Sequence, residues 1–235
     1  MTYSDMDRFA IFTTMHWMPI VLVLLFMIFV SNYAKDKTFE KQRRIGTILA
    51  LIPLILLILR RLVLVLKGIN LTADELPFHL CNILSIVMPY FMWKVDRHWL
   101  AISYFLLGAG TIQAIISPDL LDGPRYFEYY AYFISHTVLV GLAYYIIVVY
   151  NIRPTIRDLF GAFLVANVFL IFSIIVNYFL GTNFFYSMHK PDGFSPLDYF
   201  GPWPWYLLVC ELLALLLFFI AYLPVLWLNK GEQVA

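Results

Sequence analysis

The sequence predicts an all-α membrane protein, a polytopic bundle of about seven transmembrane helices, and three observations support this fold class. Hydrophobic residues make up 62% of the 235-residue chain, well above the roughly 45–50% of soluble domains. Seven apolar stretches approach the roughly 20 residues that cross a bilayer. Charged residues, only 13% of the chain, gather mainly between these stretches. We expect a single transmembrane domain over residues 1–235.

The expected spans, in chain order, are residues 14–33, 45–66, 77–93, 99–117, 129–150, 158–180 and 203–228. The third is short for a full crossing, so we expect it to be tilted or to begin below the membrane surface. Segment 181–202 is rich in glycine, proline and aromatic residues, which indicates a defined external loop. Asp5, Asp7 and Arg8 precede the first apolar run without a small-residue cleavage site after it, so we expect no cleaved signal peptide.

Lysine and arginine predict the orientation, because short cytoplasmic loops are enriched in both residues. The segment before the second span is the most basic part of the chain, with Lys35, Lys37, Lys41, Arg43 and Arg44. Later segments on the same side add Lys94, Arg97, Arg153, Arg157 and Lys230. The opposite side has Arg8, Lys67, Arg125 and Lys190. We therefore predict an N-terminus outside and a C-terminus in the cytoplasm.

Composition also argues against several partners. The net charge is +1 and no basic tail is present, so nucleic acid is not an expected partner. Cys81 and Cys210 lack the spacing of a disulfide framework or a metal site and predict free thiols. The sequence implies no cofactor and no soluble protein partner.

Polar residues recur at one depth, near the predicted outer ends of the spans. The segment LPFHLCN (76–82) places His79, Cys81 and Asn82 at the start of the third span. Other spans add His16, Arg60, Arg61, Gln113, His136, Asn177 and Glu211. Ionisable groups inside a membrane are costly, and buried polar groups need partners. We therefore expect one shared cavity in the outer leaflet, covered by the loop at 181–202.

Cys81 is the candidate nucleophile of this layer. A nearby histidine or helix N-terminus favours the thiolate, but Cys81 is expected just beyond the first turn, where the helix dipole helps little. His79 precedes it by two residues and would point to the opposite side of a helix. His136, roughly 10 Å below the outer end of its span, is the better-placed base. The alternative for Cys81, and the favoured interpretation of Cys210, is packing as a small hydrophobic residue.

The other polar residues of the third and fifth spans also allow two interpretations. His79 or Asn82 would donate to an oxyanion or orient a substrate, although asparagine also joins membrane helices. His136 would otherwise bond to Tyr132, one turn earlier, or to a backbone carbonyl within the bundle.

The charged residues of the layer, and the glycines near it, also have competing interpretations. Arg60 or Arg61 would bind a lipid phosphate, with only one of the two facing the cavity, or would reach the outer head groups. Glu211 is expected to form a structural salt bridge with an arginine. Gly108 and Gly110 indicate close helix packing.

Three motifs resemble a known family: LPFHLCN (76–82), GTNFFY (181–186) and GPWPWYLL (201–208). They are similar to the YwaF-type bacterial integral membrane proteins, which are related to eukaryotic transmembrane protein 164, an acyltransferase that remodels ether phospholipids. The wider group includes the androgen-induced membrane hydrolases of fatty-acid esters. The resemblance spans nearly the whole chain and implies a protein of the bacterial cell membrane. It also implies a cysteine acyl-enzyme with a histidine partner, which correspond here to Cys81 and His136.

The leading hypothesis is therefore a lipid acyltransferase that moves an acyl chain from a phospholipid, through a thioester, to a lysophospholipid. With water as the acceptor the same dyad would make a lipid esterase. A second hypothesis is a membrane protein that binds or transports a small solute without catalysis. A third is a metal-dependent hydrolase using His79, His136 and a carboxylate, but the absence of an HxxxH or HExxH pair argues against it.

Overall fold

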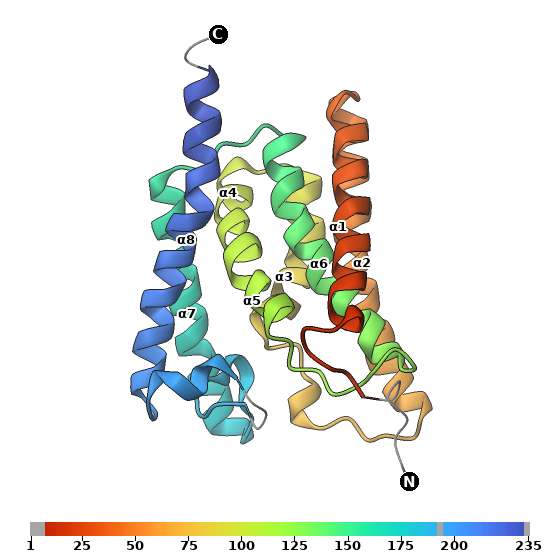
Figure 1. Ribbon diagram of the computed structural model, residues 1–235, viewed down its shortest axis with the longest axis vertical. Helices are drawn as coiled ribbons and strands as arrows, with labels where there is room; N and C mark the ends of the chain where they lie inside the picture. The colour runs from red at the N-terminus through yellow and green to blue at the C-terminus, as the bar shows by residue number, and fades with distance from the viewer. Residues whose placement is uncertain (1–7, 192–194, 233–235) are drawn as a thin grey trace.

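The computed structural model shows a bundle of helices that cross the molecule in alternating directions (Figure 1). It describes residues 8–191 and 195–232, so Asp5 and Asp7 lie outside the described residues. Seven helices within these ranges are long and apolar enough to cross a membrane, which confirms the predicted fold class. The described residues contain no β-strand beyond an isolated bridge between Arg8 and Asp122.

The α-helices are α1 (Thr14–Lys35), α2 (Phe39–Leu66), α3 (Leu80–Lys94), α4 (Arg97–Phe105), α5 (Thr111–Ile116), α6 (Phe127–Val148), α7 (Ile156–Leu180) and α8 (Trp205–Glu232). The π-helix η2 (Leu106–Gly110) joins α4 to α5, so these three elements make one span. Short 3-10 helices are η1 (Ala73–Glu75), η3 (Phe184–Tyr186) and η4 (Pro196–Phe200). Each predicted span has an observed counterpart, although α2 begins at Phe39, before the predicted residue 45.

The third span combines the short 3-10 helix η1, an extended segment and a short α-helix. Helix α3 has 15 residues, which is about 22 Å and shorter than the roughly 30 Å hydrocarbon core. Leu76 is extended, as the residue before a proline tends to be. His79 is also extended and is the N-cap of α3. It therefore lies outside the helix that the sequence predicted to include it.

Local sequence signals explain where several helices begin and end. The Asp96 side chain accepts hydrogen bonds from two backbone N–H groups at the start of α4, a typical N-cap. Thr155 and Asp158 form a capping box at the start of α7. Gly181, with φ +65°, ends α7 in the left-handed conformation that glycine adopts readily. These caps position both ends of the helix that leads into the loop at 181–202.

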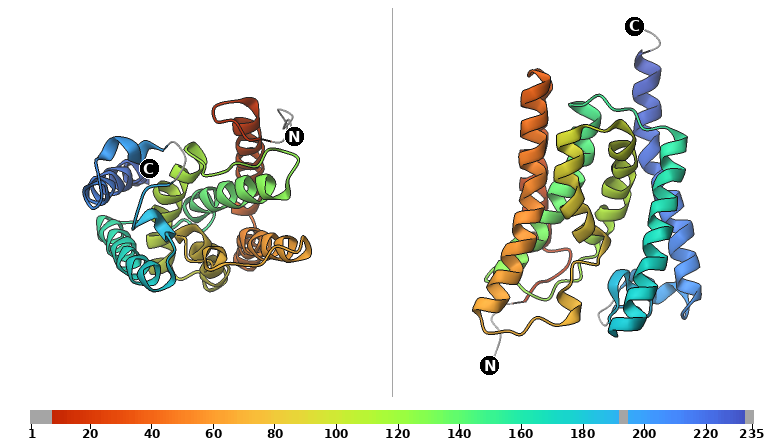
Figure 2. Two further views of the ribbon diagram at one scale, coloured as in Figure 1. Left: turned by 90° about the horizontal axis from the view of Figure 1, so that it is seen from below. Right: turned by 180° about the vertical axis from the view of Figure 1, so that it is seen from behind.

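The span α4–α5 and helix α6 form the centre of the bundle, with the other helices around them (Figures 1 and 2). The most apolar part of each central span is 61% buried, against 11% for α8 and 22% for α7. Helices α7 and α8 pack on α4 and η2, whereas α1 and α2 pack on α6. The C-terminal pair of helices is therefore attached to the rest mainly through the central span.

The N-terminal segment and the loops that precede α3, α6 and α8 lie at one end of the bundle, which we term the loop end (Figure 1). The backbone N–H of Phe9 donates to the carbonyl of Leu121 at 2.9 Å. Phe9 also packs on a small apolar cluster of Ile20, Ile115, Tyr129 and Phe133. The N-terminal segment thus supports the side of α6 that bears His136.

His16 does not join the predicted polar site. Its ring is fully buried, its Nδ1 accepts the Phe12 N–H at 3.1 Å, and its Nε2 lies 2.7 Å from the carbonyl of Ile115. Nε2 must therefore carry the proton and donate it to that carbonyl. Nε2 thus fastens α1 to the end of α5, while Nδ1 holds the N-terminal segment just before α1.

Candidate functional site

A cavity of about 1120 Å³ opens at the loop end. It exceeds the roughly 300–1,000 Å³ of most small-molecule pockets. Its walls come from α2, α3, η2, α5, α6, α7 and α8 and from the loops between them. It brings together eight of the residues singled out in the sequence: Arg60, Arg61, His79, Cys81, Asn82, Gln113, His136 and Glu211.

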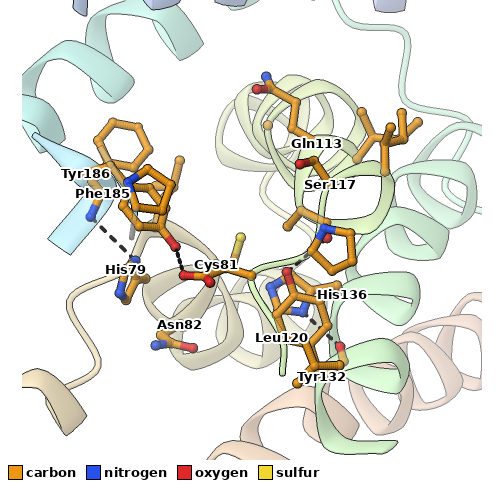
Figure 3. A pocket seen from close by; sticks show the side chains of 18 of the residues that line it. His79, Cys81, Asn82, Gln113, Ser117, Leu120, Tyr132, His136, Phe185 and Tyr186 are labelled. Atoms are coloured by element: carbon orange, nitrogen blue, oxygen red, sulfur yellow. Dashed lines mark hydrogen bonds between the residues drawn. The ribbon is translucent and has the colours of Figure 1, made fainter. Parts of the chain in front are cut away.

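Cys81 is the second residue of α3 and faces the cavity (Figure 3). Its thiol donates to the Thr111 hydroxyl at an S–O distance of 3.9 Å. This cysteine was expected beyond the first turn, which was wrong because α3 begins at Leu80. In the first turn, the helix dipole and the unpaired N–H groups favour a thiolate.

His79 lines the same cavity as Cys81, contrary to the expectation that the two point to opposite sides. That expectation assumed helical geometry, whereas His79 is the extended N-cap residue. The backbone N–H of Phe185 donates to His79 Nδ1 through a long hydrogen bond of 3.4 Å. The neutral ring then carries its proton on Nε2 and acts as a hydrogen-bond donor from that atom.

His136 has the opposite arrangement. Its Nδ1 lies 2.8 Å from the backbone carbonyl of Tyr132, which only accepts hydrogen bonds, so Nδ1 carries the proton. Nε2 then has a free lone pair, as a general base requires. The Tyr132 ring packs on the imidazole with centroids 4.2 Å apart, and its hydroxyl donates to the carbonyl of Ala114. A bond from His136 to a backbone carbonyl was the structural alternative to catalysis. Here that bond fixes the tautomer whose Nε2 can accept a proton.

Cys81 and His136 share the cavity, but among the described residues no hydrogen bond joins them. Both Tyr132 and Tyr186 lie within electrostatic range of the thiol. In Figure 3 the cysteine lies between the group of His79 and Tyr186 on one side and that of His136 and Tyr132 on the other. Proton transfer to His136 therefore requires the thiol to leave Thr111.

Both arginines of α2 line the cavity, so the expectation that only one would face it was wrong. The Arg60 guanidinium donates to both carboxylate oxygens of Glu75, at 2.6 and 3.3 Å. Arg61 donates instead to the backbone carbonyls of Glu75 and Leu57. Since its direct partners are uncharged, Arg61 is the better candidate to bind an anionic group.

Glu211 has an asparagine as its partner rather than the predicted arginine. The side-chain amide of Asn167 donates to Glu211 at 2.7 Å and to the carbonyl of Phe163 at 3.0 Å. The pair connects α7 to α8 at the wall of the cavity. Asn167 was missed because nothing in the sequence distinguishes it from an asparagine that only joins two helices.

Three further side chains complete the wall. The Gln113 amide donates to the carbonyl of Ala109 at a long 3.5 Å. The Asn82 side chain lines the cavity and has no protein hydrogen-bond partner in the described ranges 8–191 and 195–232. Cys210, interpreted as a packing residue, also lines the cavity.

Asn177 was predicted to join this site and does not line it. Its side chain is 2% exposed. Its Nδ2 donates to the Phe184 carbonyl and the Ser187 hydroxyl, and its Oδ1 accepts from the Thr182 hydroxyl and the Phe184 N–H, all at 2.8–2.9 Å. Asn177 therefore anchors the loop that begins at residue 181.

This loop covers part of the cavity and supplies residues that the sequence analysis missed. Phe185 and Tyr186 line the cavity, with φ of +59° and +50°. The Tyr186 hydroxyl donates to the Asp119 carboxylate at 2.5 Å, and Asp119 also lines the cavity. Burial, followed by the hydrogen bond to Asp119, raises the pKa of Tyr186, so its hydroxyl stays protonated. The motif GTNFFY was the only sequence signal for Tyr186.

The two glycines of the fourth span were expected in a close helix contact, which was wrong for Gly110. A Cβ there would meet no atom within 4 Å, and one at Gly108 would meet Ala143 at an ordinary 3.8 Å. Both residues lie in η2, and single π-helical turns occur frequently at functional sites. Gly110 leaves space at the cavity wall.

The fold and the site define a multi-pass helical membrane protein with a cavity that holds two free cysteines and two histidines. A model of the TMEM164 family matches residues 11–222. The chain belongs to this family, which confirms the relationship to transmembrane protein 164 inferred from its motifs. No curated protein and no solved structure matches the chain.

Proposed function

We propose that this protein is a membrane-embedded lipid acyltransferase that uses Cys81 as nucleophile and His136 as base. The observation that supports it best is the shared cavity, which is lined both by a free thiol at a helix N-terminus and by a histidine with an unprotonated Nε2. Burial of both groups among lipid-facing helices suits a substrate that enters from the bilayer.

The first half-reaction forms an acyl-enzyme. His136 Nε2 takes the proton of the Cys81 thiol, and the thiolate attacks the carbonyl carbon of a phospholipid ester. A carbon–sulfur bond forms, the ester carbon–oxygen bond breaks, and the departing lysophospholipid oxygen takes the proton from His136. In the second half-reaction His136 takes a proton from the hydroxyl of an acceptor lysophospholipid. That oxygen attacks the thioester, and Cys81 recovers its proton from His136.

Two groups on the α3 side suit the oxyanion of each tetrahedral intermediate. His79 presents a protonated Nε2, and the Asn82 amide is free of protein partners in the described residues. Donors placed before reaction stabilise developing negative charge strongly in a water-poor site. Arg61 would bind the lipid phosphate, because a guanidinium matches phosphate geometry well.

The location of the site follows from the same proposal. The loop end is the end predicted to lie outside by its scarcity of lysine and arginine. The cavity would then open towards the outer leaflet of a bacterial cell membrane, where phospholipids and lysophospholipids diffuse in laterally.

The test is turnover by the purified protein in vesicles that contain a phospholipid with a labelled acyl chain and an unlabelled lysophospholipid. Wild-type protein should transfer the label and accumulate a hydroxylamine-sensitive adduct on Cys81. Cys81→Ala should do neither, while Cys210→Ala, which removes a second thiol from the same cavity, should retain the adduct. Turnover that persists in Cys81→Ala would refute the nucleophile assignment. Release of labelled fatty acid without transfer would identify a lipid esterase with the same dyad.

A further inference from the structure

The cavity continues well beyond the polar site into the bundle. Its lining follows three elements inward from the loop end: residues 106–117 along η2 and α5, 128–139 along α6, and 206–218 along α8. At 1.5 Å per residue, each path is roughly 16–18 Å long. The hydrocarbon of one leaflet is about 15 Å thick, half of the bilayer core. The three paths therefore give the same cavity depth, which fits one extended acyl chain.

Small residues on three helices keep this inner part open. The lining includes Ala109 and Gly110 on η2, Ala166 on α7 and Ala214 on α8. The Cβ position of Gly110 has no neighbouring atom within 4 Å. Larger apolar side chains around them, such as Leu139, complete an apolar wall suited to hydrocarbon.

The inner end of the cavity is closed by Phe218 on α8. This ring is 2% exposed and packs against Phe105, with centroids 5.9 Å apart. Phe105 also contacts Tyr222, one turn further along α8. Just behind, the Tyr104 hydroxyl donates to the carbonyl of Ala221 at 2.7 Å, which fixes α4 to α8. Phe218 is thus held between two helices and has little freedom to move away from a longer chain.

We propose that Phe218 is the end of an acyl-chain channel and sets the longest chain that the protein accepts. The inference rests on the proposed function, since it assigns the chain of the reacting phospholipid to this channel. The reacting ester lies at Cys81, the chain runs inward between η2, α6 and α8, and its methyl end meets the Phe218 ring. Ala214 lies one turn nearer to the polar site on the same face of α8.

Substitutions at two positions test this inference with opposite expected outcomes. Phe218→Ala should lengthen the channel, with Phe218→Leu as a milder change, and Ala214→Leu should shorten it. Each is made in the Cys81→Ala protein and given an equimolar mixture of phosphatidylcholines with 12-, 16- and 20-carbon chains. Bound lipid is measured by native mass spectrometry, which requires no turnover. We expect the ratio of long to short chains to rise about tenfold or more in Phe218→Ala and to fall similarly in Ala214→Leu.

Phe219→Ala is the matched control, because Phe219 is the neighbouring phenylalanine, faces away from the cavity and packs on Phe160. Unchanged chain ratios in both channel variants, or an equal shift in Phe219→Ala, would overturn the inference. Repeating the competition with free fatty acids shows whether the channel selects the chain alone or only within a phospholipid. Chain selection without any turnover in the Cys81-containing protein would refute the proposed reaction and leave the channel standing.

Discussion

The histidines of this protein show how one residue type acquires different roles from its hydrogen-bond partners. His16 has both ring nitrogens bonded to backbone groups and is structural. At His79 a backbone N–H occupies Nδ1, whereas at His136 a backbone carbonyl does so. His79 therefore presents Nε2–H to the cavity as a hydrogen-bond donor, whereas His136 presents an unprotonated Nε2 that can act as a base. These roles follow from neighbours that are distant in sequence or depend on local helix geometry.

His136→Gln should lower kcat by about 10²–10⁴-fold, the usual contribution of a general base. The glutamine keeps a hydrogen-bonding side chain but accepts no proton. Single-turnover measurement of Cys81 acylation checks this prediction. His98→Gln, an exposed histidine at the opposite end of the bundle, is the control and should retain the wild-type rate. Equal rates for His136→Gln and the wild type would remove His136 from the mechanism.

Asn177→Ala should destabilise the protein by about 2–4 kcal/mol, because it leaves several buried partners without hydrogen bonds. Thermal unfolding in detergent is the measurement. Asn82→Ala is the comparison: its side chain has no protein partner in the described residues, so its unfolding temperature should stay close to that of the wild type. A similar unfolding temperature for all three proteins would contradict the anchoring role of Asn177.

The depth of each residue along its predicted helix placed much of the site correctly. It failed for residues whose position depends on non-helical segments. The fixed rise per residue brought Cys81 and His136 to one cavity, as the structure also does. It misplaced Asn177, because the returning loop that binds its side chain has no regular repeat. The facing of His79 was wrong for a related reason, since the helix starts at Leu80, three residues later than predicted and one residue after His79. Asp119 and Tyr186 lie in loops, where no periodicity indicates which way a side chain points.

At the scale of the elements, two glycines in neighbouring spans have contrasting surroundings. A Cβ at Gly141 on α6 would lie 2.5–2.8 Å from Met27 on α1, including its Cβ, whereas one at Gly110 would meet nothing within 4 Å. Glycine therefore permits the close contact of α1 with α6 in one case and contributes open space in the other. Because both residues are glycines, the sequence alone does not distinguish the two roles.

Gly141→Ala should destabilise the protein by about 1–3 kcal/mol, the usual range for an overpacked contact. Gly110→Ala should leave stability unchanged or slightly higher, because alanine favours helix more than glycine does. Chemical denaturation of the two variants in the same detergent compares them directly. Equal losses of stability would show that the α1–α6 contact does not depend on the missing side chain.

The π-helix was the main element that the sequence did not predict. Hydropathy and length located the whole fourth span but carry no information on a local change from the i→i+4 to the i→i+5 bonding pattern. Its consequence is geometric, because the wider turn places Ala109 and Gly110 at the cavity wall. The long, strongly apolar spans were predictable because burial in lipid demands length and apolarity, and little else.

At the scale of the whole molecule, the distribution of charge predicts which end of the bundle faces outward. Single cysteines at Tyr199 and Lys41, both exposed and at opposite ends of the bundle, are introduced into a Cys81→Ala/Cys210→Ala background. In intact cells a membrane-impermeant maleimide should label Tyr199→Cys and spare Lys41→Cys. Both should react after the cells are lysed. The reverse pattern in intact cells would invert the predicted orientation and move the cavity to the inner leaflet.

The arrangement of the spans was not predicted, although a signal for it was present. The central span α4–α5 and helix α6 are less hydropathic than α2, α7 and α8, and they are also the most buried. Helices that contact other helices tolerate polar and small residues, whereas those in contact with lipid need continuous hydrocarbon. Hydropathy alone does not single out these two spans, because the α3 span has the lowest mean hydropathy, 1.3, and is only 28% buried.

The attachment of α7 and α8 has a consequence during synthesis. Chains fold from the N-terminus as they emerge, so a nascent protein that has completed α6 already contains both Cys81 and His136. The two helices that close the cavity, and the loop that covers it, do not yet exist at that stage. If Cys81 is the nucleophile that we propose, its thiol then faces bulk lipid from the side, and selection among lipids by the cavity begins only when the last two helices have inserted.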